Sequence, residues 1–128
     1  MAFVWNTNEL VSNIISVYST NLTLNKAACH HFDDVNYVML GIDRDNGLIA
    51  IKPVEKKDLD HHIYPDDQLH KISIGKSYGR VTSKSFIETL TDLLELDFLN
   101  KNCYKFKGEY DVIHKMMVID YKKGDSWL

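Results

Sequence analysis

The feature that most constrains the fold of this chain is an order of elements that occurs twice. Residues 13–53 and residues 71–121 each read as a short hairpin, a helical segment and a second hairpin. Aligning Asn25 with Ser83 also places Phe32 on Leu90, so the two helical segments coincide. We expect an α+β fold, mostly antiparallel, in which two repeated β-β-α-β-β halves pack around one core.

Composition and charge limit the possible classes of protein. The chain has 128 residues, of which 45% are hydrophobic and 26% charged, values that are typical of a globular protein. We expect a single domain over residues 1–128, with residues 55–68 as a polar connection between the halves. The formal net charge of −3 argues against a protein that coats nucleic acid indiscriminately, but it leaves room for one basic face.

The two cysteines, the N-terminus and the apolar runs indicate in which cellular compartment we expect the protein. Cys29 and Cys103 lack metal-site spacing, and we interpret them as buried thiols in a reducing cytosol; one disulfide is the alternative. The N-terminus has no basic leader followed by a long apolar stretch. No apolar run approaches the length of about 20 residues that spans a bilayer. We therefore expect a cytoplasmic protein with no membrane partner.

Local signals predict the individual elements of the first half. Residues 7–11 fit a short N-terminal helix. Residues 13–18 are rich in β-branched side chains and predict a strand, although a helix continuing through Val17 is the alternative. Asn25 predicts the start of a short helix, because its side chain can cap the first turn.

Two hairpins and a second helix complete the local predictions. The Asn-Gly pair within residues 44–47 predicts a tight turn in which both residues take positive φ. Ser83 predicts the cap of a helix with an apolar stripe, and residues 122–128 are expected to be loose. The predicted core comprises Leu24, Ala28, Phe32, Val38, Leu40, Ile49, Ile51, Ile72, Val81, Phe86, Leu90, Phe106, Met117 and Ile119.

No catalytic or cofactor motif stands out. Residues 75–77 (Gly-Lys-Ser) resemble the end of a phosphate-binding loop, but His70 stands where that loop needs its first glycine. His61 and His62 lie among aspartates, yet neighbouring residues point apart, so a solvated polar connection explains them better than a metal site. We predict no catalytic residue, no metal site and no cofactor.

The remaining signal is electrostatic. Residues 70–84 contain no acidic residue and carry four cations, which are Lys71, Lys76, Arg80 and Lys84. Cations on strand ends and turns can position a phosphate backbone. The alternative is a strand edge kept from aggregating by its lysines. We predict that these four residues form a nucleic-acid-binding site.

Residues 79–90, which read GRVTSKSFIETL, resemble the core of the AbrB and MraZ transition-state regulators. In those families a Gly-Arg-Ile/Val strand leads into a proline-capped helix and a hairpin. The resemblance implies a swapped-hairpin barrel that binds DNA as a dimer or larger ring, with Arg80 and Lys84 as the counterparts of the basic motif residues. Ser83 replaces the usual proline, and the arginine expected in the helix is absent. Over its whole length the chain also resembles small bacterial proteins of unassigned activity.

These observations lead to one functional expectation and two alternatives. The expectation is a DNA-binding transcriptional regulator that forms a homo-oligomer. The first alternative is a protein-interaction or self-assembly module that does not bind nucleic acid. The second is a metal-dependent enzyme that uses His61 or His62 with nearby aspartates.

Overall fold

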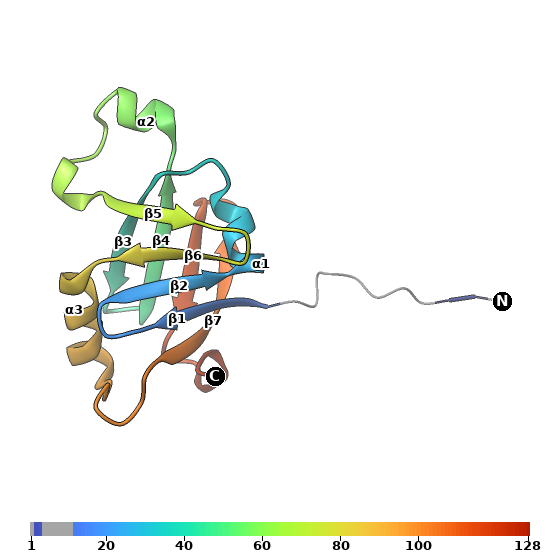
Figure 1. Cartoon of the computed structure of the whole chain (residues 1–128), viewed down its shortest axis with the longest axis vertical. Coiled ribbons are helices and arrows are strands. Elements are labelled where there is room, and N and C mark those ends of the chain that lie inside the picture. Colours follow the sequence, from blue (N-terminus) through green and yellow to red (C-terminus); the bar gives the residue numbers. More distant parts are fainter. Residues whose placement is uncertain (1, 4–11) are drawn as a thin grey trace.

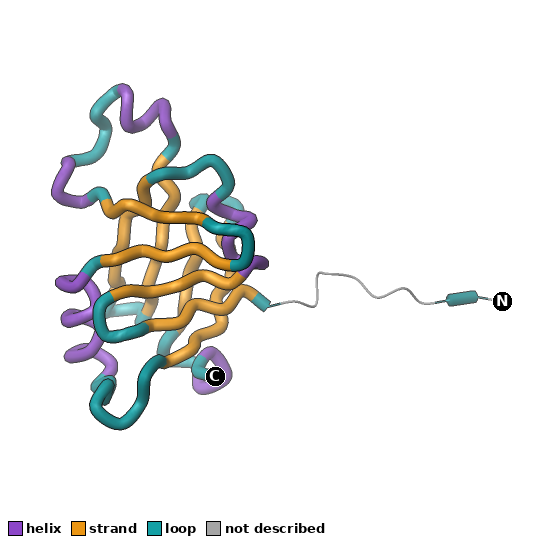
Figure 2. Tube along the Cα trace, viewed as in Figure 1, coloured by secondary structure: helices purple, strands orange, loops and turns teal. Residues whose placement is uncertain are grey.

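The computed structural model describes residues 2–3 and 12–128, and the described residues form a closed barrel of antiparallel strands (Figure 1). Its strands are β1 (Asn13–Val17), β2 (Asn21–Asn25), β3 (Tyr37–Asp43), β4 (Leu48–Val54), β5 (His70–Ile74), β6 (Tyr78–Thr82), β7 (Tyr104–Asp111) and β8 (Met116–Asp120). The helices are α1 (Lys26–Cys29), α2 (Lys56–Asp60) and α3 (Lys84–Leu94), with 3-10 turns η2 (His30–Phe32), η3 (Asp66–Gln68) and η4 (Gly124–Ser126). Figure 2 shows that the helical segments lie around the strands rather than between them.

The prediction of an α+β fold with two repeated halves is wrong. The strand order around the barrel is β1-β2-β6-β5-β3-β4-β8-β7. Each hairpin therefore has, on both sides, a strand from the other part of the chain: β2 pairs with β6, and β4 pairs with β8. A separate four-stranded half would leave two unpaired edges, whereas closing the barrel gives every strand two neighbours.

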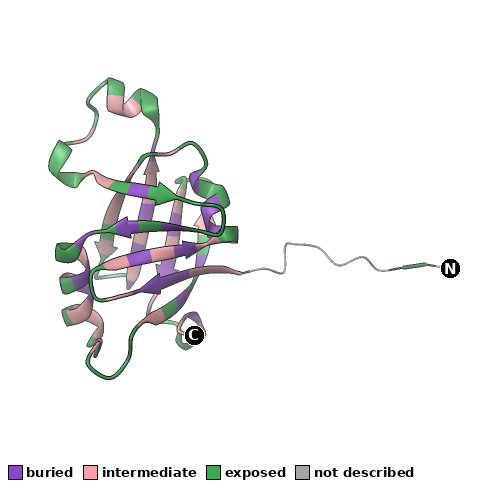
Figure 3. Cartoon of the chain, viewed as in Figure 1, coloured by how far each residue is buried: buried purple, intermediate pink, exposed green. Residues whose placement is uncertain are grey.

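The core fills the inside of the barrel. Buried residues alternate with more exposed ones along strands such as β6 and β8, and Figure 3 colours these buried positions purple. Because β2 and β6 are antiparallel, the helices that follow them, α1 and α3, lie at opposite ends of the barrel (Figure 1). The predicted core is confirmed except for Leu40 and Phe86, which are only partly buried and pack against it.

Both predicted helix caps are confirmed. The Asn25 Oδ1 atom accepts a hydrogen bond from the Ala28 amide at 3.0 Å. The Ser83 hydroxyl accepts one from the Phe86 amide at 3.4 Å. The strand predicted over residues 13–18 is β1, whereas the helix predicted over residues 7–11 lies outside the described residues.

The turn between β3 and β4 differs from the prediction. Gly47 takes a positive φ of 69°, but Asn46 does not. Instead the Asp43 carboxylate accepts hydrogen bonds from the Asn46 amide at 3.2 Å and from its side chain at 2.8 Å. These bonds stabilise a longer loop over residues 44–47 in place of the tight two-residue turn.

The C-terminal tail is held rather than loose. Trp127 bridges to Phe106 of β7, and its indole Nε1 donates a hydrogen bond to the Tyr121 carbonyl at 3.0 Å. The Leu128 amide donates to the Lys105 carbonyl at 2.8 Å. These contacts place the end of the chain against β7.

Candidate functional site

The four predicted cations lie along one side of the barrel. Lys71 is in β5, Lys76 in the turn after β5, Arg80 in β6 and Lys84 at the first position of α3. All four side chains are exposed. Within residues 2–3 and 12–128, none of them forms a salt bridge with a carboxylate. Their charges are therefore available to a ligand.

Strand pairing extends this group across the sheet. Arg80 lies directly opposite Ser73 of β5 and Thr23 of β2. Thr23 lies opposite Ser16 of β1, which in turn lies opposite Lys105 of β7. Because directly opposite residues share one face of a sheet, these five positions form one row across the sheet, with a cation near each end and the buried Ser16 between Thr23 and Lys105.

Two of the cations on this side were missed by sequence reasoning. Lys105 and Lys107 are both exposed in β7, and Lys107 lies opposite Ile14 of β1. They are far from residues 70–84 in the chain, so only the pairing of β1 with β7 brings them to the same sheet. The sequence feature that could have revealed them is their two-residue spacing in a strand, because this spacing places both side chains on one face.

Acidic residues are few on these strands, although Lys107 lines a small pocket together with Glu109 and Asp120. Strands β1, β2, β5 and β6 contain no aspartate or glutamate, and in β7 the acidic residues follow the two lysines. A chain with a net charge of −3 thus presents a surface rich in cations and hydroxyl groups. We call this surface the basic face and define it as Lys71, Ser73, Arg80, Thr82, Lys105 and Lys107.

A hollow of about 310 Å³ adjoins the basic face. It is lined by Tyr18, Asn21, Thr23, Tyr78 and Arg80. Tyr78 is 53% exposed, so it is open to a ligand in solution. The pKa of the Tyr18 hydroxyl is raised above its ordinary value, first by burial and then by the nearby Cys103 thiol and Tyr78 phenol.

Packing beneath β6 explains why Tyr78 and Arg80 face outward. The residues between and after them, Gly79 and Val81, are buried, so the alternation of the strand directs Tyr78 and Arg80 to the surface. A Cβ atom on Gly79 would lie 2.9 Å from the Cys29 Sγ atom. Gly79 thus allows α1 to pack closely under the hollow.

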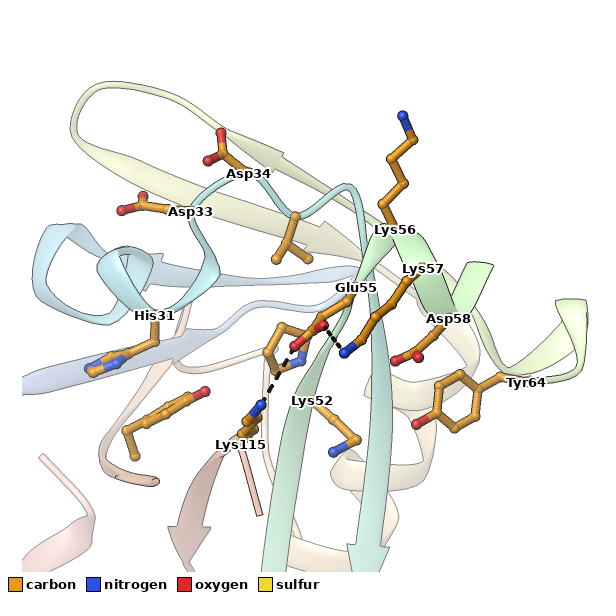
Figure 4. Close-up of a pocket in the computed structure, with 13 residues that line it drawn as sticks. His31, Asp33, Asp34, Lys52, Glu55, Lys56, Lys57, Asp58, Tyr64 and Lys115 are labelled. Atoms are coloured by element: carbon orange, nitrogen blue, oxygen red, sulfur yellow. Dashed lines mark ion pairs between the residues drawn. The ribbon is translucent and has the colours of Figure 1, made fainter. Parts of the chain in front are cut away.

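A larger cleft of about 540 Å³ lies elsewhere, at the end of β4 and beside α2 (Figure 4). Its lining mixes charges: the cations Lys52, Lys56, Lys57 and Lys115 and the anions Asp33, Asp34, Glu55 and Asp58. Glu55 pairs with Lys57 at 3.3 Å and with Lys115 at 3.8 Å, as the dashed lines show. The cleft is larger than the hollow, but its carboxylates disfavour a polyanion.

Aromatic stacking and a partly desolvated imidazole mark one wall of this cleft. The His31 and Tyr110 rings stack with centroids 4.1 Å apart and planes 9° from parallel. The pKa of His31 is lowered, mainly by burial and then by the neighbouring His30. His31 is therefore mostly neutral at neutral pH.

The two histidines that directly follow α2 lie at the surface. His61 and His62 follow α2 and are exposed, and His62 takes a positive φ of 51°. Among the described residues, no group of three or more His, Cys, Asp or Glu side chains is placed to hold a metal ion. Cys29 and Cys103 are free thiols; Cys29 is buried as expected, whereas Cys103 is only partly buried.

Three comparisons, with protein-family models, with curated proteins and with solved structures, found no match. Within the described part of the chain, no helix has the length and apolar character needed to cross a membrane.

Proposed function

We propose that this protein binds DNA through the basic face and acts as a cytoplasmic transcriptional regulator. The observation that carries the proposal is the row of opposed residues from Ser73 through Arg80 to Lys105, on strands that are almost free of carboxylates. Cations supply the attraction to phosphates, and the hydroxyl groups of Ser73 and Thr82 donate hydrogen bonds to phosphate oxygens.

The distribution of the cations favours a linear chain of phosphates over a single small anion. Lys71, Arg80, Lys105 and Lys107 come from three different strands and spread over the sheet, whereas a small anion would need them to converge on one point. Lys76 and Lys84 extend the positive potential beyond both ends of β6. A linear polyanion can contact such a spread of cations one after another.

The test is binding of a labelled DNA of mixed sequence by fluorescence anisotropy across a salt series. We compare the natural protein with the double variant Arg80→Ala, Lys105→Ala and with a control, Lys56→Ala, Lys57→Ala, which removes the same charge from the cleft. The basic-face variant is expected to bind more weakly and to lower the slope of log affinity against log salt by about 2, roughly one unit for each lost phosphate contact.

The control variant is expected to keep the slope of the natural protein. Equal weakening of both variants would show that only total charge matters and would contradict a specific face. Absence of binding by the natural protein at low salt would overturn the proposal.

A specific observation supports the alternative of a self-assembly module. Val112 and Ile113, in the turn between β7 and β8, are 76% and 87% exposed. Two adjacent exposed aliphatic side chains are suited to burial against a second molecule. Sedimentation of the natural protein and of Val112→Ser, Ile113→Ser tests this: a natural oligomer that dissociates in the variant supports assembly, and a natural monomer refutes it.

A further inference from the structure

We infer that the basic face binds DNA as a single strand, with an unpaired base stacked on Tyr78 in the hollow and Arg80 on a neighbouring phosphate. This inference rests on the proposed function and specifies the form of its ligand.

The hollow has the parts that a nucleobase site needs. Tyr18 and Tyr78 stand at opposite ends of a diagonal across β1, β2 and β6, and Asn21 and Thr23 lie between them on β2. An exposed tyrosine ring offers a flat surface on which any base can stack. The Asn21 amide can both donate and accept hydrogen bonds at the edge of a base.

Arg80 joins this hollow to the basic face. It lines the hollow and also lies in the row that runs from Ser73 to Lys105, directly opposite Thr23. A base in the hollow therefore has a guanidinium beside it and further cations along the strand of nucleotides in both directions. This combination of an aromatic platform and a cationic track is the usual arrangement for binding unpaired strands.

The hollow is small. Its volume of about 310 Å³ is at the lower end of the roughly 300–1,000 Å³ of pockets that bind small molecules. The hollow is also open to the adjoining surface, as the exposure of Tyr78 and Arg80 shows. One base can enter while the sugar and phosphates remain on the basic face.

The shape of the molecule favours an unpaired strand over a duplex. The basic face is the outside of a closed barrel and is therefore convex (Figure 1). Duplex DNA is also convex, and it is stiff, with a persistence length of about 150 base pairs. The barrel and a duplex would therefore contact each other at few phosphates. A single strand can bend around the barrel and reach Lys71, Arg80 and Lys105 together.

The Tyr18 phenol does not oppose the phosphates. The pKa of Tyr18 is raised from its ordinary value of 10.0, so its phenol is neutral at physiological pH. In the described part of the hollow's lining there is no carboxylate. The larger cleft offers the stacked His31 and Tyr110 rings, but four carboxylates accompany them.

The first test compares a labelled single strand with the same sequence as a duplex, in one buffer over a salt series. The natural protein is expected to bind the single strand at least tenfold more tightly. Tyr78→Leu is expected to weaken single-strand binding by about tenfold or more, because loss of one stacked base has an effect of this order. Its salt slope should equal that of the natural protein, since no charge is removed.

Two further variants separate stacking from a general effect on folding. Tyr78→Phe keeps the ring and is expected to bind within about threefold of the natural protein. Tyr64→Leu removes a comparable ring from the larger cleft and is expected to leave binding unchanged. The melting temperature of each variant confirms that it is folded.

A fluorescent base in the single strand gives a second measurement, which reports on stacking directly. A 2-aminopurine in the middle of the single strand is expected to change its fluorescence on binding the natural protein, and to change less with Tyr78→Leu. Equal affinity for duplex and single strand, or a Tyr78→Leu variant that binds like the natural protein, overturns this inference. If binding then still weakens with salt and with Arg80→Ala, Lys105→Ala, the proposed function stands; if neither DNA binds, both fail.

Discussion

The Cys29 Sγ atom of α1 lies 2.9 Å from the point that a Cβ atom on Gly79 of β6 would occupy. The glycine of the Gly-Arg-Val strand thus has a packing role in this barrel. The close approach seats α1 against the inner side of β6 and fixes the strand that carries Tyr78 and Arg80. The Cys29 thiol also donates a hydrogen bond to the Leu24 carbonyl at 3.4 Å, and its pKa is raised chiefly by burial.

We predict that Gly79→Ala destabilises the protein by about 1–3 kcal/mol, because the added methyl group overpacks the contact with Cys29. Urea denaturation measures the change in free energy of unfolding. Gly41→Ala is the matched control, since a Cβ atom there has nothing within 4 Å. Cys29→Ala relieves this overpacking, so the double variant should lose less stability than the sum of the two single variants; strictly additive effects would contradict the contact.

The Asn25 side chain joins three segments at the start of α1. Its Oδ1 atom accepts hydrogen bonds from the amides of Ala28 and Ile14, both at 3.0 Å, and its Nδ2 atom donates to the Ser12 carbonyl at 2.9 Å. We predict that Asn25→Ala costs about 2–3 kcal/mol, since a cap contributes about 1 and each other bond about 1.

Ser83→Ala is the natural comparison for Asn25→Ala. The Ser83 hydroxyl accepts one cap bond, from the Phe86 amide at the long distance of 3.4 Å, and we expect a loss of about 0.5–1 kcal/mol. Asn25→Asp should fall between the two alanine variants, because it keeps the acceptor and loses the donor. Thermal denaturation of the three variants orders them; a reversed order would refute the bridging role.

Trp127 should contribute to stability although it lies next to the end of the chain. Its ring packs against Phe106 with centroids 4.7 Å apart, and its indole donates a hydrogen bond to the Tyr121 carbonyl. We expect Trp127→Ala to cost about 2–3 kcal/mol and Trp127→Phe about 1 kcal/mol, the latter from loss of the hydrogen bond. Chemical denaturation measures both, and a tail without a structural role would give no change.

Stability should decrease as the pH falls below neutrality. Burial lowers the pKa of His70 below its ordinary value of 6.5, and that of His31 is lowered as well. The unfolded chain then binds more protons, so this contribution is present above pH 6.5 and is lost as the pH falls through the lower folded values. Urea denaturation between pH 7.5 and 5.5 should show the decline, and a smaller one for His70→Asn; a flat natural profile would contradict it.

Local features of the fold were predictable from the sequence. Asn25 and Ser83 cap helices because their side chains reach amides only three residues ahead. Leu22 and Leu24 are apolar residues at alternate positions of β2, and this spacing predicts that they lie on one buried face of the strand. Such signals depend on neighbours in the chain and can be read without knowing the rest of the molecule.

The candidate site was predictable only in part. Lys71, Lys76, Arg80 and Lys84 form one run in the chain, so a pattern of charge reveals them. Lys105 joins them only because β1 pairs with both β2 and β7. Tyr18 and Tyr78 likewise share a hollow only because β2 pairs with β6. No local pattern specifies these pairings, since many strands with inward apolar residues could hydrogen-bond to one another.

The sequence by itself determined where strands, turns and helix caps fall, because propensity, alternation and capping act over a few residues. The tertiary structure decided that these hairpins interlace into one closed barrel instead of two separate halves. The physical reason is that the backbone groups that join strands are alike in almost every residue, so they do not specify which strands pair. Closure is selected because it leaves no edge unpaired and buries every inward face at once. The basic face and the hollow beside Tyr78 both arise from that closure.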